Sequence, residues 1–225
     1  MGRDITFARA DGGEAAGYLA ETARAKAPGV VMVQEWWGLQ DQIKRLADRL
    51  AGDGYNVLCP DLYEVTPVEY HDTTNAERLM DGLDHLSATD QQVCGAARYL
   101  ARDGAKVGLT GYCLGGVVTV LGAVRIPEFA AASCYYGIPS PELADPAQIS
   151  IPFQGHFASR DTWCLPAAVD VLERSLENAD RESEIFRYEA EHGFMNDDLP
   201  DDYDAALTDQ AWNRDLKFWA KHLDV

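Results

Sequence analysis

Cys113 is the residue of this chain best placed to act as a nucleophile. It follows a short apolar run that begins at Lys106, and the segment 111–116 around it contains three glycines. A strand that turns sharply into a helix strains the residue at its apex, and glycines there avoid clashes because they lack a Cβ atom. The spacing is that of the G-x-S-x-G nucleophile elbow, with cysteine in place of serine. The pattern predicts a reactive thiol at a helix N-terminus; the alternative is a buried structural cysteine at a tight turn.

A thiol nucleophile requires a base that accepts its proton and a carboxylate that orients the base. In hydrolases with this kind of elbow the chain order is nucleophile, acid, histidine. Cys113, Asp161 and His192 follow that order. Asp161 and His192 each come just after a predicted strand, so we expect both at the sheet edge that carries the elbow. The alternative for Asp161 is a solvent-facing turn residue.

The other histidines fit the role of the base less well. They are His71 in a predicted irregular loop, His85 on a polar helix, His156 within a strand and His222 in the last helical turn. For His156 we expect a core histidine whose hydrogen bonds are satisfied. His192 alone follows a late strand in a loop that contains glycine.

Buried strands and amphipathic helices alternate along the chain, which predicts a doubly wound α/β fold with a mostly parallel sheet and helices on both faces. The apolar run before the elbow is one expected strand. Further strands are expected at 5–9, 15–20, 30–33, 55–59, 130–137, 151–158 and 184–188. Helices are expected at 39–50, 76–86, 90–102, 117–124, 165–179 and 204–222. The first two strands flank the turn signal Asp11-Gly12-Gly13 and predict an antiparallel hairpin at a sheet edge.

Composition limits the classes of function. The 225 residues are 47% hydrophobic and 25% charged, as expected for one globular domain over 1–225. The net charge of −18 disfavours nucleic acid and anionic membranes as partners. The five cysteines are an odd number without a C-x-x-C pair, so we expect reduced thiols, no metal and no other cofactor. The N-terminus lacks a signal-peptide pattern, which favours the cytoplasm. We expect a monomer or weak homo-oligomer that acts on a small molecule.

Six segments together resemble the dienelactone hydrolase family of the α/β-hydrolase fold. They are Gln34-Glu35-Trp36-Trp37-Gly38, Cys59-Pro60-Asp61-Leu62-Tyr63, the elbow at 108–116, Tyr135-Tyr136-Gly137, the segment 156–161, and Glu191-His192-Gly193-Phe194. The likeness extends over nearly the whole chain. It implies a hydrolase of lactone, ester or thioester bonds in which Cys113 is the nucleophile, His192 the base and Asp161 the orienting acid.

The resemblance also assigns roles to the residues after the third expected strand. It implies that Glu35 lies beside the thiol, keeps it neutral in the empty enzyme and moves when substrate binds, which protects the thiol from oxidation. The backbone N–H groups of Leu114 and Trp36 would form the oxyanion hole. Of Trp36 and Trp37, we expect one to line the pocket and the other to pack; the alternative is that both are core aromatics.

The expected substrate contacts depart from the family pattern. Dienelactone hydrolases proper bind a substrate carboxylate with two arginines, but Asn196 stands at one of these positions, and Arg78 is the candidate for the other. Tyr112, Phe194 and Trp37 complete the set of candidate substrate-binding residues. Without the arginine pair, and near the acidic run at 197–202, a neutral lactone or ester should be a better substrate than an acidic dienelactone.

A second class of function is a non-catalytic protein of this fold that binds a small ligand. The complete set of Cys113, Asp161 and His192, with Glu35 in addition, favours the enzyme, because a binding protein has no use for all four residues.

Overall fold

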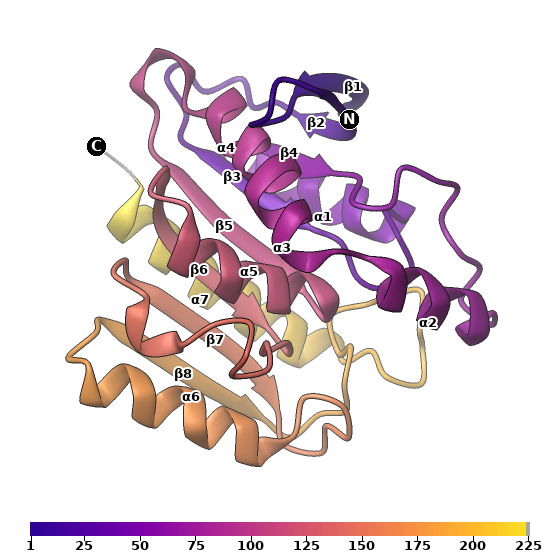
Figure 1. Cartoon of the computed structure of the whole chain (residues 1–225), viewed down its shortest axis with the longest axis vertical. Coiled ribbons are helices and arrows are strands. Elements are labelled where there is room, and N and C mark those ends of the chain that lie inside the picture. Colours follow the sequence, from indigo (N-terminus) through magenta and orange to yellow (C-terminus); the bar gives the residue numbers. More distant parts are fainter. Residues whose placement is uncertain (224–225) are drawn as a thin grey trace.

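The computed structural model describes residues 1–223, and its centre is one eight-stranded sheet in the order β1-β2-β4-β3-β5-β6-β7-β8 (Figure 1). The strands are β1 (Arg3–Ala8), β2 (Glu14–Ala20), β3 (Gly29–Val33), β4 (Asn56–Pro60), β5 (Val107–Tyr112), β6 (Phe129–Tyr135), β7 (Phe153–Ala158) and β8 (Ser183–Tyr188). β2 pairs antiparallel with β1 and with β4, and the other pairings are parallel. The prediction of a doubly wound, mostly parallel sheet with an N-terminal hairpin is confirmed.

Helices cover both faces of the sheet (Figure 1). They are α1 (Asp41–Gly52), α2 (Thr73–Gly82), α3 (His85–Ala88), α4 (Cys94–Leu100), α5 (Leu114–Arg125), α6 (Pro166–Asn178) and α7 (Ala205–His222). The apolar side chains of α4, α5 and α6 share one hydrophobic core, and those of α1 and α7 share the core on the opposite face. The central strands are therefore buried on both faces, which explains why β3 and β5 contain no exposed residue.

Two expected helices have different boundaries in the structure. The helix expected at 76–86 is two helices, because α2 ends at Gly82 and the Asp84 side chain caps a new helix by accepting a hydrogen bond from the Ser87 N–H. The helix expected at 90–102 begins with a wide turn at Thr89–Val93 and continues as α4. Aside from these two, the expected helices and strands are present with shifts of a few residues at their ends.

His156 lies in the core, as predicted. Its Nδ1 atom is 2.7 Å from the Tyr188 hydroxyl, and its Nε2 atom is 3.1 Å from Oδ1 of Asp215 on α7. Asp215 also accepts hydrogen bonds from the hydroxyls of Ser133 and Tyr135, at 2.6 and 2.8 Å. This buried network fixes α7 to β6 and β7, and it contains no group that substrate could reach.

The parallel strands end at one edge of the sheet, and the loops that follow β3, β5, β7 and β8 carry Glu35, Cys113, Asp161 and His192. Side chains that are far apart in the sequence therefore meet at that edge. None of the helices within residues 1–223 is long and apolar enough to span a lipid bilayer.

Candidate active site

Cys113 forms a sharp elbow between β5 and α5. Its backbone has φ 56° and ψ −114°, a conformation that is strained for a residue with a side chain. A Cβ atom on Gly111 would lie 2.3 Å from the Gly115 carbonyl oxygen, and one on Gly115 would lie 2.4 Å from the Val33 carbonyl oxygen. Only glycine fits at these two positions, so the glycines allow β5, α5 and β3 to hold the strained cysteine at the sheet edge.

Asp161 and His192 are joined by a short hydrogen bond. The Nδ1 atom of His192 is 2.7 Å from Oδ2 of Asp161. The other carboxylate oxygen, Oδ1, accepts the backbone N–H groups of Trp163 and Cys164, each at 2.8 Å. Asp161 is 4% exposed and is therefore not a solvent-facing turn residue. Both of its oxygens are used, so the carboxylate fixes the orientation of the imidazole ring.

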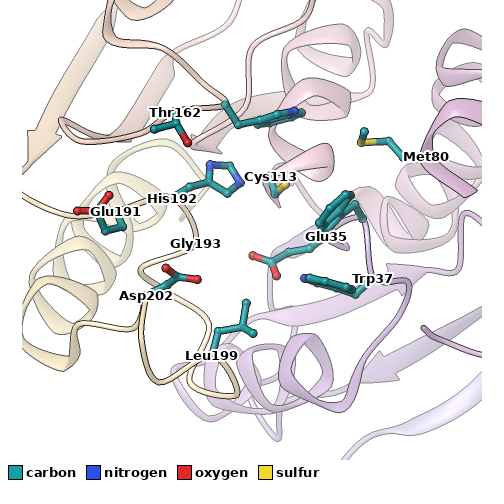
Figure 2. A pocket seen from close by; sticks show the side chains of 12 residues that line it. Glu35, Trp37, Met80, Cys113, Thr162, Glu191, His192, Gly193, Leu199 and Asp202 are labelled. Atoms are coloured by element: carbon teal, nitrogen blue, oxygen red, sulfur yellow. The ribbon is translucent and has the colours of Figure 1, made fainter. Parts of the chain in front are cut away.

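The opposite edge of the imidazole faces the cavity near Cys113. Figure 2 shows the His192 ring beside the Cys113 side chain. The Nε2 atom is buried and has no hydrogen-bond partner within residues 1–223. Burial alone lowers the pKa of His192, but the negative charge of a Cys113 thiolate and the bond to Asp161 outweigh burial and raise the pKa to about 10. The His192 ring therefore binds a proton more strongly than a free imidazole does.

Glu35 is buried at the end of β3 and is oriented by neutral donors. The Tyr136 hydroxyl donates to Oε1 at 3.1 Å, and the Asn196 amide donates to Oε2 at 2.6 Å. Burial raises the pKa of Glu35, while the Asn196 bond, the charge of His192 and the Tyr136 bond oppose that rise. Glu35 thus lines the same cavity as Cys113, and its carboxylate is directed to Asn196 and Tyr136 by these bonds.

The two backbone positions expected to form the oxyanion hole lie at the start of α5 and in the cavity wall. Leu114 is the first residue of α5, so its N–H has no acceptor within the helix. Trp36 directly follows Glu35 and lines the cavity. The positive end of the α5 dipole adds to the field at the sulfur.

These groups surround one cavity of about 300 Å³ (Figure 2). It is lined by Glu35, Trp36, Trp37, Met80, Cys113, Thr162, Trp163, Glu191, His192, Gly193, Leu199 and Asp202. Both Trp36 and Trp37 line it, whereas only one was expected to. Their rings meet edge to face with centroids 4.7 Å apart, and Trp37 also packs on Tyr70. Trp37 therefore both lines the cavity and packs against Tyr70.

Four of the expected substrate contacts are not found among the lining residues. Arg78 lies exposed on α2 and its Nε donates to the Asn75 side chain at 3.4 Å, while Met80 of the same helix reaches the cavity. Tyr112 and Phe194 are buried in the core behind the cavity. Asn196 is fully buried and acts on the carboxylate of Glu35 instead. A substrate contact of these four residues stays a prediction.

Trp163 lines the cavity although it was not among the residues predicted from the sequence. Its ring is 44% exposed and meets the His192 ring edge to face, with centroids 5.1 Å apart. The available signal was a large aromatic residue two positions after the orienting acid, in a polar turn. Met80 and Leu199 gave no comparable signal, because apolar residues in helices and loops are common in any core.

Comparison with known proteins identifies the family of this chain. The model of the dienelactone hydrolase family matches residues 15–223. Protein usf of Aquifex pyrophilus is 29% identical over 235 residues, covering 99% of this chain and 100% of the relative. A protein of Escherichia coli K12 named "Putative carboxymethylenebutenolidase" is 30% identical over 214 residues, covering 87% of this chain and 77% of the relative.

A solved structure agrees with these sequence relatives. The crystal structure titled "Putative Dienelactone Hydrolase" from Klebsiella pneumoniae is 26% identical in sequence. It superimposes with a TM-score of 0.86 and covers 99% of this chain and 100% of its own. The chain therefore belongs to the dienelactone hydrolase family, a family of carboxylic ester hydrolases with the α/β-hydrolase fold.

Proposed function

We propose that this enzyme hydrolyses a lactone, ester or thioester bond of a small molecule through a Cys113-His192-Asp161 triad. The observation that carries the proposal is the 2.7 Å bond between His192 and a fully engaged Asp161, at a cavity that is also lined by Cys113. A histidine oriented in this way presents its free Nε2 atom as a base.

The reaction follows from these positions. The Cys113 thiol gives its proton to Nε2 of His192, and the thiolate attacks the carbonyl carbon of the substrate. The carbonyl oxygen becomes an oxyanion that accepts hydrogen bonds from the backbone N–H groups of Leu114 and Trp36. The tetrahedral intermediate collapses, the C–O or C–S bond breaks, and the imidazolium protonates the leaving group.

Hydrolysis of the acyl-enzyme uses the same groups in reverse. His192 removes a proton from water, the hydroxide attacks the thioester carbon, and the second oxyanion forms in the same N–H pair. Its collapse breaks the bond between the acyl carbon and Sγ of Cys113 and releases the carboxylic acid, and His192 returns the proton to the sulfur. Glu35 stays outside the proton path in this scheme, and its charge tunes how readily the neighbouring thiolate forms.

The cavity walls support a neutral substrate over an anionic one. Glu35, Glu191 and Asp202 line the cavity, and none of its lining residues within 1–223 is a lysine or arginine. A substrate carboxylate would meet carboxylates instead of an arginine pair, so we expect a neutral lactone to have a higher kcat/KM than an acidic dienelactone of equal size. We place the reaction in the cytoplasm, which suits an enzyme whose five cysteines are all free thiols.

The direct test is the release of product from an activated aryl ester. We expect p-nitrophenyl acetate to give a burst that iodoacetamide abolishes. The other four cysteines should react slowly, because burial raises the pKa of each: Cys59, Cys94, Cys134 and Cys164. Cys164→Ser is the matched control and should keep the burst. A protein that binds the ester without a burst would be the non-catalytic alternative.

A further inference from the structure

Three carboxylates in the cavity wall, those of Glu35, Glu191 and Asp202, take no part in the triad. Glu191 is paired, since its Oε1 atom lies 2.6 Å from Nε of Arg160. Glu35 is held by the neutral donors Tyr136 and Asn196. Asp202 has neither a side-chain hydrogen bond nor an ion pair within residues 1–223. Figure 2 shows its carboxylate directed into the cavity.

The pKa of the Asp202 carboxyl group is shifted by its surroundings. Partial burial raises its pKa; the charge of His192 opposes the rise, and Asp201 and Glu191 add to it. The cavity therefore holds a carboxylate whose charge would be stabilised by a cation in the space that substrate fills.

Indole rings form much of the remaining wall. Trp36, Trp37 and Trp163 all line the cavity, and Trp163 is 44% exposed next to His192. The face of an indole ring carries partial negative charge and attracts ammonium groups, most strongly where water is excluded. Indoles and an unpaired carboxylate in one cavity therefore select for positive charge, whereas the indoles alone would also suit a neutral apolar group.

We propose that the enzyme prefers esters or lactones that carry an ammonium group, held between the Asp202 carboxylate and the ring of Trp163. Trp163 packs against His192, and Asp202 lines the same cavity as Cys113 and His192, so the cation would sit in the substrate cavity instead of at a remote surface. This inference rests on the hydrolase function proposed above. It adds the charge of the substrate, which the triad itself does not determine.

A pair of isosteric substrates tests the proposal. The cationic ester is p-nitrophenyl 4-(trimethylammonio)butanoate, and the neutral ester is p-nitrophenyl 5,5-dimethylhexanoate, in which carbon replaces the ammonium nitrogen. Each kcat/KM is divided by the rate constant for hydrolysis by hydroxide, which removes the difference in intrinsic reactivity. We expect the corrected kcat/KM of the cationic ester to be higher by about tenfold, and added salt to narrow the gap.

Two variants of equal charge assign the effect to one residue. Asp202→Asn should reduce the preference for the cation by about fivefold, whereas Asp201→Asn, at the exposed neighbouring position, should change it less than about twofold. Trp163→Leu should also weaken the preference, with a smaller loss for Trp163→Phe.

The possible failures are distinguishable. Equal corrected values for the two esters would overturn this inference and leave the hydrolase function intact. Equal losses in the two aspartate variants would assign the preference to the overall charge of −18 and overturn the role of Asp202. Absence of a Cys113-dependent burst with either ester would overturn the proposed function together with the inference.

Discussion

Replacing Asp161 with asparagine probes the chemistry of the triad with almost no change of shape. The Asp161 Oδ1 atom accepts the N–H groups of Trp163 and Cys164, each at 2.8 Å. In Asp161→Asn the amide oxygen must keep these two bonds, so the NH₂ group faces Nδ1 of His192. The ring must then accept a bond at Nδ1 and carry its proton on Nε2. An Nε2 atom that already has a proton cannot take one from the thiol.

The expected loss is large. The variant removes a bond to a charged group, which contributes about 1.5–3 kcal/mol, and it also stabilises the wrong tautomer of the base. Together these effects correspond to a decrease of roughly 10²–10⁴ in kcat, since each 1.4 kcal/mol is a factor of ten. The pKa of His192, now about 10, should fall because one of the charges that raise it is gone.

The assay is the turnover of p-nitrophenyl acetate together with the rate of iodoacetamide alkylation from pH 5 to 10. In the variant, alkylation should require a higher pH, because the imidazolium that stabilises the thiolate is lost. Asp201→Asn is the control for the change of charge and should match the wild type. Full activity of Asp161→Asn across this range would refute the reasoning and mean that another group orients His192.

Three further changes test the structure around the site. Gly115→Ala should lower the free energy of unfolding by more than about 2 kcal/mol, because its Cβ would lie 2.4 Å from a strand carbonyl oxygen; Gly52→Ala, with no atom within 4 Å, should not lower it. Asp215→Asn should cost about 3 kcal/mol in urea unfolding, since it breaks a buried network. Asn196→Leu should raise the pKa of Glu35 further, because it removes the 2.6 Å hydrogen bond to the carboxylate. The pH dependence of Cys113 alkylation measures this effect, and an unchanged profile would show that Glu35 does not influence the thiol.

The sequence was sufficient to predict the fold because its signals are local. Continuous apolar, valine-rich runs such as 30–33 occur where a strand is buried on both faces, and glycines at 111, 115 and 116 occur where backbones approach closely. The split between α2 and α3 was missed, although aspartate is favoured at N-caps over helix interiors, because Asp84 was interpreted as part of one continuous helix.

The site was less predictable where it depends on contacts across the fold. The order of Cys113, Asp161 and His192 could be read from the chain, but the bond between Asn196 and Glu35 joins residues 161 positions apart. No pattern near Asn196 indicates that its amide would be buried against that carboxylate. The residues that line the cavity also depend on how distant segments pack together. Met80 lines the cavity although Arg78, on the same helix, does not.

The central claim is that Cys113 carries the acyl group during turnover. Acid quenching of the reaction with p-nitrophenyl acetate, followed by peptide mass mapping, measures this directly. We predict one acetyl group per chain on Cys113, absent from Cys113→Ala and accumulating in His192→Ala only slowly, because the base serves both steps. An acetyl group on another residue, or burst kinetics that persist in Cys113→Ala, would contradict the account.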